Sequence, residues 1–247
     1  MKHIYIGSLS AYARLILVLT TSAMLVGCVV PGRPIPEARL SSIKTIGVIS
    51  VAAFRLNVID TSPLSIPSYK GSIEVSDMAL DELMVQRIAG LLSPTLEIKP
   101  VTYKPAEFLA GYKPDTSLFH DCPNVIPDIG EITKQLPNDG AVDAYVVIYP
   151  RCVSLVHFDG FVLQTESLPF KDTIYVMLGS YTLDIVDART HEILGTKPLF
   201  IMANTNKSAW PEGMRFTDDQ RPRFKKDFET AMDYGIGPVL KSVGLIR

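Results

Sequence analysis

The sequence has 247 residues, of which 47% are hydrophobic and 20% are charged, and its formal net charge is −2. This composition is typical of a globular protein with one hydrophobic core and excludes a disordered chain. The charge balance is mildly acidic, and the basic cluster of Arg221, Arg223, Lys225 and Lys226 is interleaved with acidic residues. We therefore expect no nucleic-acid partner.

Residues 1–27 have the pattern of an export signal. A weakly positive leader with Lys2, His3 and Arg14 precedes an apolar stretch that begins at Leu15. This stretch is shorter than the roughly 20 apolar residues that a permanent membrane-spanning helix requires. We interpret it as a signal peptide that the mature protein lacks. Two of the 24 basic residues and none of the 26 acidic residues lie in it, so the mature chain has a net charge of −4.

The signal ends in Leu25-Val26-Gly27-Cys28, which resembles the lipobox of bacterial lipoproteins. In that family a diacylglycerol is attached to the Cys sulfur, the signal is cut before the Cys, and the new amino group usually receives an acyl group such as palmitate. The resemblance implies that Cys28 is lipidated, and two or three acyl chains hold a protein far more firmly than one. Val29 stands where an inner-membrane retention signal typically has Asp, which implies the outer membrane, with the domain facing the periplasm. The alternatives are an uncleaved signal anchor and an ordinary secretory signal.

Residues 28–40 contain Pro31, Pro34 and Pro36 and show no apolar period. This composition predicts an extended, semi-rigid tether between the lipid and the folded part. We therefore expect a single periplasmic domain over residues 41–247.

Cys122 and Cys152 are the two thiols that remain once Cys28 is acylated. In an oxidising periplasm they can form a disulfide, which would stabilise the fold by about 3.5 kcal/mol in the chain-entropy model. The alternative is two separate buried cysteines that act as small hydrophobic residues. We favour the disulfide, because one thiol lies in a Pro-rich loop and the other lies near a strand end.

The first half of the domain has the pattern of a β-α-β unit. Residues 43–51 form an apolar, β-branched run that is typical of a strand buried on both faces. Residues 52–75 predict an edge hairpin or a long loop. Residues 77–92 predict an amphipathic helix with acidic side chains near its start, and residues 96–101 alternate as a second strand, parallel to the first.

The middle of the chain predicts a short helix and a third buried strand. Residues 104–125 are irregular and expected on the surface. A helix that starts at Pro127 places Ile129, Ile132 and Leu136 at helical spacing. Residues 143–149 then form an apolar run that predicts the third strand.

The last third predicts two hairpins and a helix. Residues 152–163 favour a hairpin that turns at Asp159-Gly160. A longer hairpin is expected from Ile174–Asp187, which alternates with period two, through a turn at residues 188–191, to a returning strand over residues 192–202. In residues 224–243 we expect two helical pieces, separated at Gly235, Gly237 and Pro238.

Together these elements predict an α/β (α+β) fold, a mixed sheet with a parallel start, a long antiparallel hairpin and packed helices. The strand at residues 143–148 and the turn at residues 187–194 resemble small α/β domains of envelope lipoproteins, such as the curli-secretion lipoprotein and the lipoprotein activators of penicillin-binding proteins. The resemblance spans residues 41–202, although His191 stands where such turns often carry Gly. It implies a non-catalytic binding or assembly role.

The histidines offer three candidate catalytic groupings, which are His120 with Asp121 and Cys122, His157 with Asp159, and His191 with Glu192. Adjacent residues of a strand point to opposite faces, and the Asp-Gly pair fits a turn better than an active site. The sequence contains no phosphate-binding loop, nucleophile elbow, zinc-protease helix or Cys-x-x-Cys pair. We therefore predict no catalytic, cofactor-binding or metal-binding residue and expect a protein that is not an enzyme.

A loop with Trp210, Met214, Arg215 and Phe216 contains residue types that are enriched at interfaces, but we favour a plug that caps the core. The sequence thus predicts a lipid-anchored envelope protein that binds another envelope protein. The alternatives are a hydrolase that acts on envelope polymers and a carrier of an apolar ligand, which needs a cavity between sheet and helices.

Overall fold

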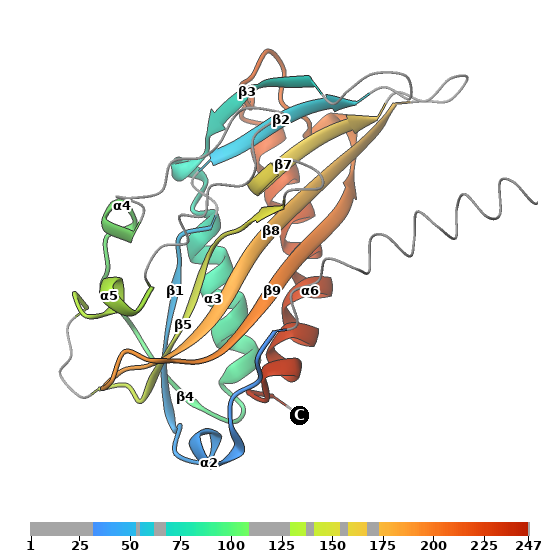
Figure 1. Cartoon of the computed structure of the whole chain (residues 1–247). Helices are drawn as coiled ribbons and strands as arrows, with labels where there is room; N and C mark the ends of the chain where they lie inside the picture. The colour runs from blue at the N-terminus through green and yellow to red at the C-terminus, as the bar shows by residue number, and fades with distance from the viewer. Residues whose placement is uncertain are drawn as a thin grey trace, which may run out of the picture. The chain divides into compact units, whose positions relative to one another are not determined.

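A mixed sheet organised along one long strand, β8 (Ile174–Asp187), forms the centre of the fold (Figure 1). On one side, β9 (Ile193–Thr205) pairs with β8 in antiparallel fashion along almost its full length. On the other side, β8 pairs with two strands placed end to end. These are β5 (Ala144–Pro150), beside the C-terminal half of β8, and β7 (Phe158–Glu166), beside its N-terminal half.

The same division continues across the sheet. Strand β1 (Thr45–Ser50) lies parallel to β5, and β2 (Arg55–Thr61) lies parallel to β7. Beyond them, β4 (Glu97–Lys99) pairs in parallel with β1, and β3 (Ser68–Glu74) pairs in antiparallel fashion with β2. The predicted mixed sheet with a parallel start and a long antiparallel hairpin is therefore confirmed.

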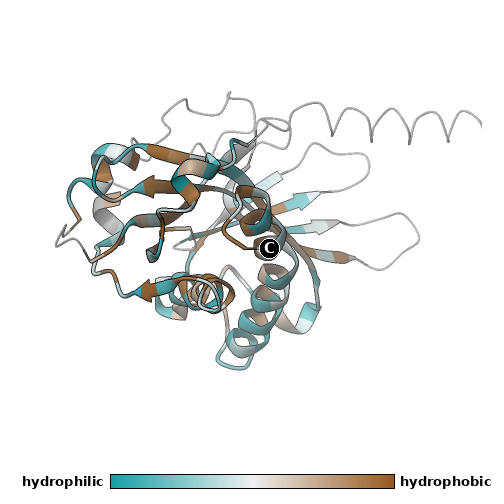
Figure 2. Ribbon diagram, turned by 90° about the horizontal axis from the view of Figure 1, so that it is seen from below, coloured by the Kyte–Doolittle hydropathy of each residue, from teal (hydrophilic) through white to brown (hydrophobic). Residues whose placement is uncertain are grey.

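This computed structural model describes residues 32–52, 55–61, 68–108, 129–136, 141–153, 158–166 and 173–246, and residues 32–247 belong to one compact unit. Helices α3 (Leu80–Leu92) and α6 (Gln220–Val243) cover one face of the sheet (Figure 1). Hydrophobic residues concentrate on the strands, whereas the outer turns of α6 are hydrophilic (Figure 2). The main core lies between these layers, and its largest fully buried side chains include Phe161, Tyr181, Phe224, Phe228, Leu80 and Met84.

The opposite face carries a smaller core over the lower half of the sheet. Short helices α4 (Pro105–Phe108) and α5 (Ile129–Thr133) lie on this face beside β5 (Figure 1). Their residues Phe108 and Ile129 are buried with Tyr145, Val147 and Tyr149 of β5. Every residue of β5 is therefore buried, as its continuous apolar pattern predicted.

Helix α3 begins later than the sequence predicted, because Ala79 has a left-handed φ of 53°. A 3-10 turn, η1 (Ser76–Met78), precedes it, and the α-helix proper starts at Leu80. The predicted apolar stripe is correct, since Leu80, Met84 and Ile88 are buried. The helix is followed by β4, which confirms the second parallel strand.

Helix α6 is continuous, so the expected break at Gly235, Gly237 and Pro238 is wrong. Pro238 lies on the exposed side of the helix, where water can solvate the carbonyl that the missing N–H leaves free. Gly235 serves packing, since a Cβ there would lie 2.7 Å from the backbone oxygen of Phe200 in β9. Glycine thus lets the helix approach the sheet closely.

The first hairpin also differs from the prediction. Strand β6 (Cys152–Val153) pairs with Asp159 and Phe158, and residues 154–157 between the two strands lie outside the described residues. Asp159 and Gly160 lie inside β7. Gly160 has a positive φ of 61°, at the point where β7 stops pairing with β6 and begins to pair with β8. Glycine favours this backbone conformation, which explains why the Asp-Gly pair suggests a turn in the sequence.

The expected tether also differs from what the structure shows over residues 32–40. Arg33 forms a β-bridge with Thr196 of β9, Ile35 is buried, and the helix α2 (Glu37–Leu40) follows. The N–H of Ile35 donates to the carbonyl of Val243 in α6. Long-range contacts with β9 and α6 therefore draw this Pro-rich stretch into the fold.

We predict opposite effects for two glycines of α6. Gly235→Ala should lower the free energy of unfolding by about 1 to 2 kcal/mol, because overpacking against Phe200 outweighs the gain in helix propensity. Gly237→Ala should be neutral or stabilise by up to about 1 kcal/mol, because nothing lies within 4 Å of its added Cβ. Urea unfolding followed by circular dichroism measures both. Equal effects of the two substitutions would contradict the close approach at Gly235.

Candidate functional site

A groove of about 720 Å³ runs between α3 and the chain that follows β4. Its walls are mostly apolar and come from β1, α3 and residues 98–105. The main apolar lining residues are Val48, Leu80, Val85, Ile98, Val101 and Tyr103. Its polar lining residues include Asp81, Glu82, Gln86 and Lys99. In size and lining it resembles the pockets that hold small apolar molecules.

Asp81 closes one end of this groove by joining α3 to the end of β1. Its Oδ1 accepts a hydrogen bond from the Ser50 hydroxyl at 2.5 Å and another from the Ala52 N–H at 2.8 Å. Ser50 is fully buried, so its hydroxyl is not accessible to a substrate as a nucleophile. The Ser50–Asp81 pair therefore holds two elements together and offers no reactive group to the groove.

Tyr103 forms the second polar connection of the groove. Its hydroxyl donates to the carbonyl of Ser50 at 2.8 Å and accepts from the N–H of the same residue at 3.1 Å. Burial raises the pKa of Tyr103; the Ser50 backbone bond works against this, and the carboxylates of Asp81 and Glu82 add to it. Tyr103 thus stays neutral and fixes the chain after β4 against β1, which shapes the groove.

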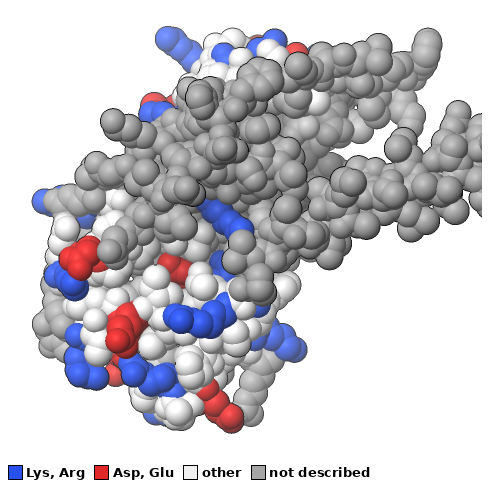
Figure 3. Space-filling model, in the orientation of Figure 1, with Lys and Arg blue, Asp and Glu red and all other residues white. Residues whose placement is uncertain are grey.

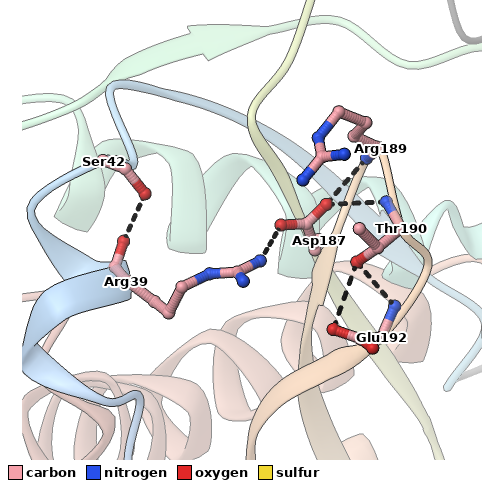
Figure 4. Close-up of polar contacts among 6 residues, drawn as sticks. All are labelled: Arg39, Ser42, Asp187, Arg189, Thr190 and Glu192. Atoms are coloured by element: carbon pink, nitrogen blue, oxygen red, sulfur yellow. Dashed lines mark hydrogen bonds and ion pairs between the residues drawn. The ribbon is translucent and has the colours of Figure 1, made fainter.

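A second polar cluster surrounds the turn between β8 and β9 (Figure 4). Asp187 Oδ1 accepts hydrogen bonds from the N–H of Arg189 at 2.9 Å and from the N–H of Thr190 at 2.7 Å, and Oδ2 pairs with the guanidinium of Arg39 in α2. Partial burial alone would raise the pKa of Asp187, but the bonds from Thr190, Arg189 and Arg39 outweigh it and hold the pKa below its usual value. The carboxylate therefore organises the turn and joins α2 to it.

Asp143 has a similar role at the start of β1. Its Oδ2 accepts from the N–H groups of Lys44 and Thr45, both at 2.8 Å, and from the Thr45 hydroxyl at 2.9 Å. Partial burial opposes these bonds, yet they lower the pKa of Asp143 overall. A hollow of about 610 Å³ lies between Asp143, Asp187 and α2. Since the two carboxylates are held by the protein's own donors, we interpret this cluster as structural.

A buried carboxyl group lies in the middle of the sheet. Asp184 of β8 is 1% exposed and accepts a hydrogen bond from the Tyr149 hydroxyl of β5 at 2.9 Å. Burial raises the pKa of Asp184, although the side-chain hydrogen bonds from Thr196 and Tyr149 and the charge of Arg33 lower the pKa in part. Burial and the neighbouring Asp184 also raise the pKa of Tyr149. This pair is closed to solvent and does not form an open acid/base site.

Of the three candidate catalytic groupings, the structure describes only His191 with Glu192 in full, and it gives these two side chains different partners. His191 has a left-handed φ of 59°, as its place in a turn that often carries Gly indicates, and its Nδ1 lies 3.3 Å from Thr133 Oγ1 of α5. Glu192 is near Thr190 instead. His120, His157, Cys28 and Cys122 lie outside the described residues, as does the side chain of Cys152. The disulfide between Cys122 and Cys152 and the lipidation of Cys28 therefore stay predictions.

Trp210 and Phe216 cap the upper end of the main core. The Trp210 ring packs on Tyr175 with centroids 5.0 Å apart, and Phe216 is buried against Phe224 at 4.7 Å. This packing agrees with the plug that we favoured over an interaction surface. Lys and Arg alternate with Asp and Glu over the visible described part of the face in Figure 3. That face therefore has no patch of a single charge.

Within the described ranges, no group of three or more His, Cys, Asp or Glu side chains could hold a metal ion. No helix in the same part of the chain is long and apolar enough to cross a membrane. The structural roles of Asp81, Asp143 and Asp187 were not predicted from the sequence. Among these three residues, Asp143 has the clearest sequence signal. It directly precedes a buried strand, where a carboxylate can accept N–H groups from the start of a neighbouring strand.

No protein-family model matches this chain, and no curated protein matches it either. Among solved structures, a DUF330 protein from Xanthomonas campestris is similar, with 7% identity, a TM-score of 0.37, and coverage of 81% of this chain and 85% of that one. Lipoprotein GNA1162 from Neisseria meningitidis has 12% identity and a TM-score of 0.30, with coverage of 77% and 99%. A neuraminyllactose-binding hemagglutinin homologue from Helicobacter pylori has 11% identity and a TM-score of 0.31, with coverage of 83% and 85%. A lipoprotein is thus among the similar structures, but scores this low carry no argument about function.

The lowered pKa of Asp187 predicts a pH-dependent contribution to stability. Because its pKa is lower in the folded than in the unfolded chain, the carboxylate stabilises the fold above its unfolded pKa, near 3.8, and this stabilisation is lost as the pH falls through the folded pKa. Wild type should therefore exceed Asp187→Asn in free energy of unfolding at pH 7, and the difference should shrink below about pH 4.

Urea unfolding at a series of pH values measures this difference. Asp218→Asn, at an exposed position before α6, is the matched control and should not differ from wild type in this pH-dependent way. A constant difference between wild type and Asp187→Asn down to pH 3 would contradict the role of the ionised carboxylate.

Proposed function

We propose that this chain is a lipid-anchored protein of the bacterial cell envelope with a non-catalytic binding or assembly role, facing the periplasm from the outer membrane. The lipobox ending at Cys28 is the observation that carries the proposal. Lipidation at Cys28 would confine the domain to a thin layer beside the membrane. Confinement raises the effective concentration of the domain toward envelope neighbours, as a linker does for two joined modules.

The attachment of residues 32–40 supports this proposal. Gly32 is the first described residue, and Arg33 is already bound to β9 through its bridge with Thr196. Four residues beyond Cys28 span at most about 14 Å, since an extended chain covers about 3.3 to 3.6 Å per residue. A lipid at Cys28 would therefore hold the domain at the membrane surface, within reach of other components of that membrane.

The hydrogen bonds and burial of four Asp carboxylates support a non-catalytic role. Asp81, Asp143 and Asp187 accept hydrogen bonds from backbone N–H groups of neighbouring elements, and Asp184 is closed to solvent. Ser50, the hydroxyl nearest a carboxylate in the groove, is fully buried. The hydrolase alternative requires a nucleophile that a neighbouring base activates. Ser76, Thr102, Asp81 and Glu82 line the groove beside α3, but Asp81 already accepts hydrogen bonds from Ser50 and Ala52, and the described lining residues include no His.

The anchor and the binding role can be tested in one preparation. Cys28→Ser should move the protein from the membrane fraction to the soluble fraction, and mass spectrometry should find acyl groups on the wild type alone. Cys122→Ser is the matched control and should stay with the membrane. A stoichiometric envelope protein should co-purify with detergent-extracted wild type after cross-linking. The same distribution for wild type and Cys28→Ser, without an acyl mass, would reject the anchor; repeated recovery without a partner would reject the binding role.

The groove favours a second candidate function, a carrier of an apolar ligand. A carrier needs an apolar cavity for its ligand, and the groove has a volume of about 720 Å³ and mostly apolar walls. The groove is half-open, and the exposed side chains of Glu82, Gln86 and Lys99 lie along it. This arrangement suits a molecule with an apolar body and a polar end.

We predict that the hydrophobic dye N-phenyl-1-naphthylamine binds in this groove and that its fluorescence rises on binding. Val85→Trp fills the groove and should weaken the dye at least about tenfold, equivalent to about 1.4 kcal/mol. Val239→Trp is the matched control, because Val239 is also a partly buried valine on a helix but lies outside the groove. Equal dye affinity of both variants would remove the carrier function.

A further inference from the structure

Exposed apolar side chains gather on one edge of the domain. Four large hydrophobic residues are exposed in the described part of the chain, and three of them are Phe200 at 47% and Met202 at 67% exposed on β9 and Tyr234 at 76% exposed on α6. Phe200 and Met202 point from the same face of β9, because they alternate with the buried Leu199 and Ile201, and we call these two residues the edge patch. Soluble surfaces rarely expose clustered apolar groups without a function, and β9 is also the edge strand of the sheet.

Tyr234 belongs to the other side of the sheet, because α6 packs on β9 through the buried side chains of Leu199 and Ile201, which alternate with Phe200 and Met202. Its neighbour Gly235 packs directly on the backbone of Phe200 and on Ile201. Asp227, seven residues before Tyr234 and hence on the same face of the helix, bonds to Thr205 of β9. Tyr234 therefore lies outside the edge patch.

Residues 32–35 run along the outer side of β9, next to this patch. Ile35 lies against Gly195, Arg33 is bridged to Thr196, and Gly32 lies against the side chain of Lys197. Each step back along the chain is therefore a step along β9 toward Phe200. At Gly32 the chain is four residues from Cys28, the residue that would carry the lipid.

Distances along the chain put the patch within reach of the anchor. Phe200 lies four residues beyond Thr196, about 13 Å along β9, and Met202 lies about 20 Å along it. Five residues separate Arg33 from Cys28, which corresponds to at most about 18 Å of extended chain. The same short connection that binds the domain to the lipid therefore brings the edge patch close to the bilayer.

We propose that the edge patch rests on the lipid bilayer, with Phe200 and Met202 in the headgroup layer. This inference depends on the lipid anchor of the proposed function and adds which face of the domain meets the membrane. Large apolar side chains such as Phe suit the boundary between acyl chains and headgroups, because burial there removes their apolar surface from water. Arg151, whose guanidinium lies 5.9 Å from the Phe200 ring centroid, and Lys197 supply cations for lipid phosphates.

Contact with the bilayer also explains why this edge stays exposed in the domain by itself. The described strands leave β9 without a partner strand on its outer side, apart from the bridge at Arg33. An apolar edge strand is a site of aggregation when it faces water. The lipid surface covers this edge and leaves the groove beside α3, on β1 and β4 at the other end of the strand order, facing away.

Quenching by brominated lipid tests the inference. The acylated full-length protein, with Trp210→Phe to remove the native indole, is placed in vesicles of phosphatidylcholine that carries bromine near the headgroup. Phe200→Trp and, separately, Met202→Trp should lose about half of their fluorescence or more, since the bromines lie at the depth of interfacial side chains. Lys70→Trp is the control, because β3 lies about 19 Å from β9 across four strand spacings and its indole should keep its emission.

Three outcomes are distinguishable. Strong quenching at 200 and 202 but not at 70, with the acyl mass present, supports the inference. Equal quenching at all three positions, with the acyl mass present, overturns the orientation and leaves the anchor intact. Absence of the acyl mass on the purified protein rejects the anchor, and the inference falls with it. Circular dichroism of each variant confirms that the Trp substitutions leave the fold unchanged.

Discussion

The continuous pairing of β8 with β9 is the constraint on which the rest of the structure depends. Each other pair of described strands includes at least one shorter strand, whereas β8, with 14 residues, and β9, with 13, pair along almost their full length. On its other side, β8 pairs with both β5 and β7. The turn that joins β8 to β9 is held by Asp187, which binds two turn N–H groups and the guanidinium of Arg39. The hairpin therefore sets the register of the sheet and also receives the N-terminal segment.

The β8–β9 hairpin relates two features of the chain, which are the residues that follow Cys28 and the exposed apolar side chains of β9. Residues 32–35 are bound along β9, so few residues would connect the domain to the proposed anchor at Cys28. A domain on a long tether samples many orientations, whereas a short connection restricts which face meets the lipid. The proposed orientation follows from this restriction together with the exposed side chains of the same edge.

Carboxylates in this fold serve connections between elements. Asp81 joins α3 to β1, Asp143 joins β5 to β1, and Asp187 joins α2 to the hairpin turn. Buried N–H groups need such acceptors, and charge-assisted hydrogen bonds of this type are stronger than neutral ones. The groove beside α3 combines mostly apolar walls with the polar side chains of Glu82, Gln86 and Lys99, and we propose binding for this surface.

Local patterns in the sequence determined the buried strands, helix α3 and the long hairpin, because apolar periodicity and turn residues depend on near neighbours alone. The turn at His191 shows this well, since its positive φ fits the place where Gly is common. Only the tertiary structure decided that α6 is continuous, that residues 32–40 belong to the domain, and that β5 and β7 share one side of β8. Each of these depends on contacts between residues far apart in the chain. In the sequence Gly235 suggests a break in the helix, whereas in the structure the backbone of Phe200, 35 positions earlier, leaves no room for a side chain there.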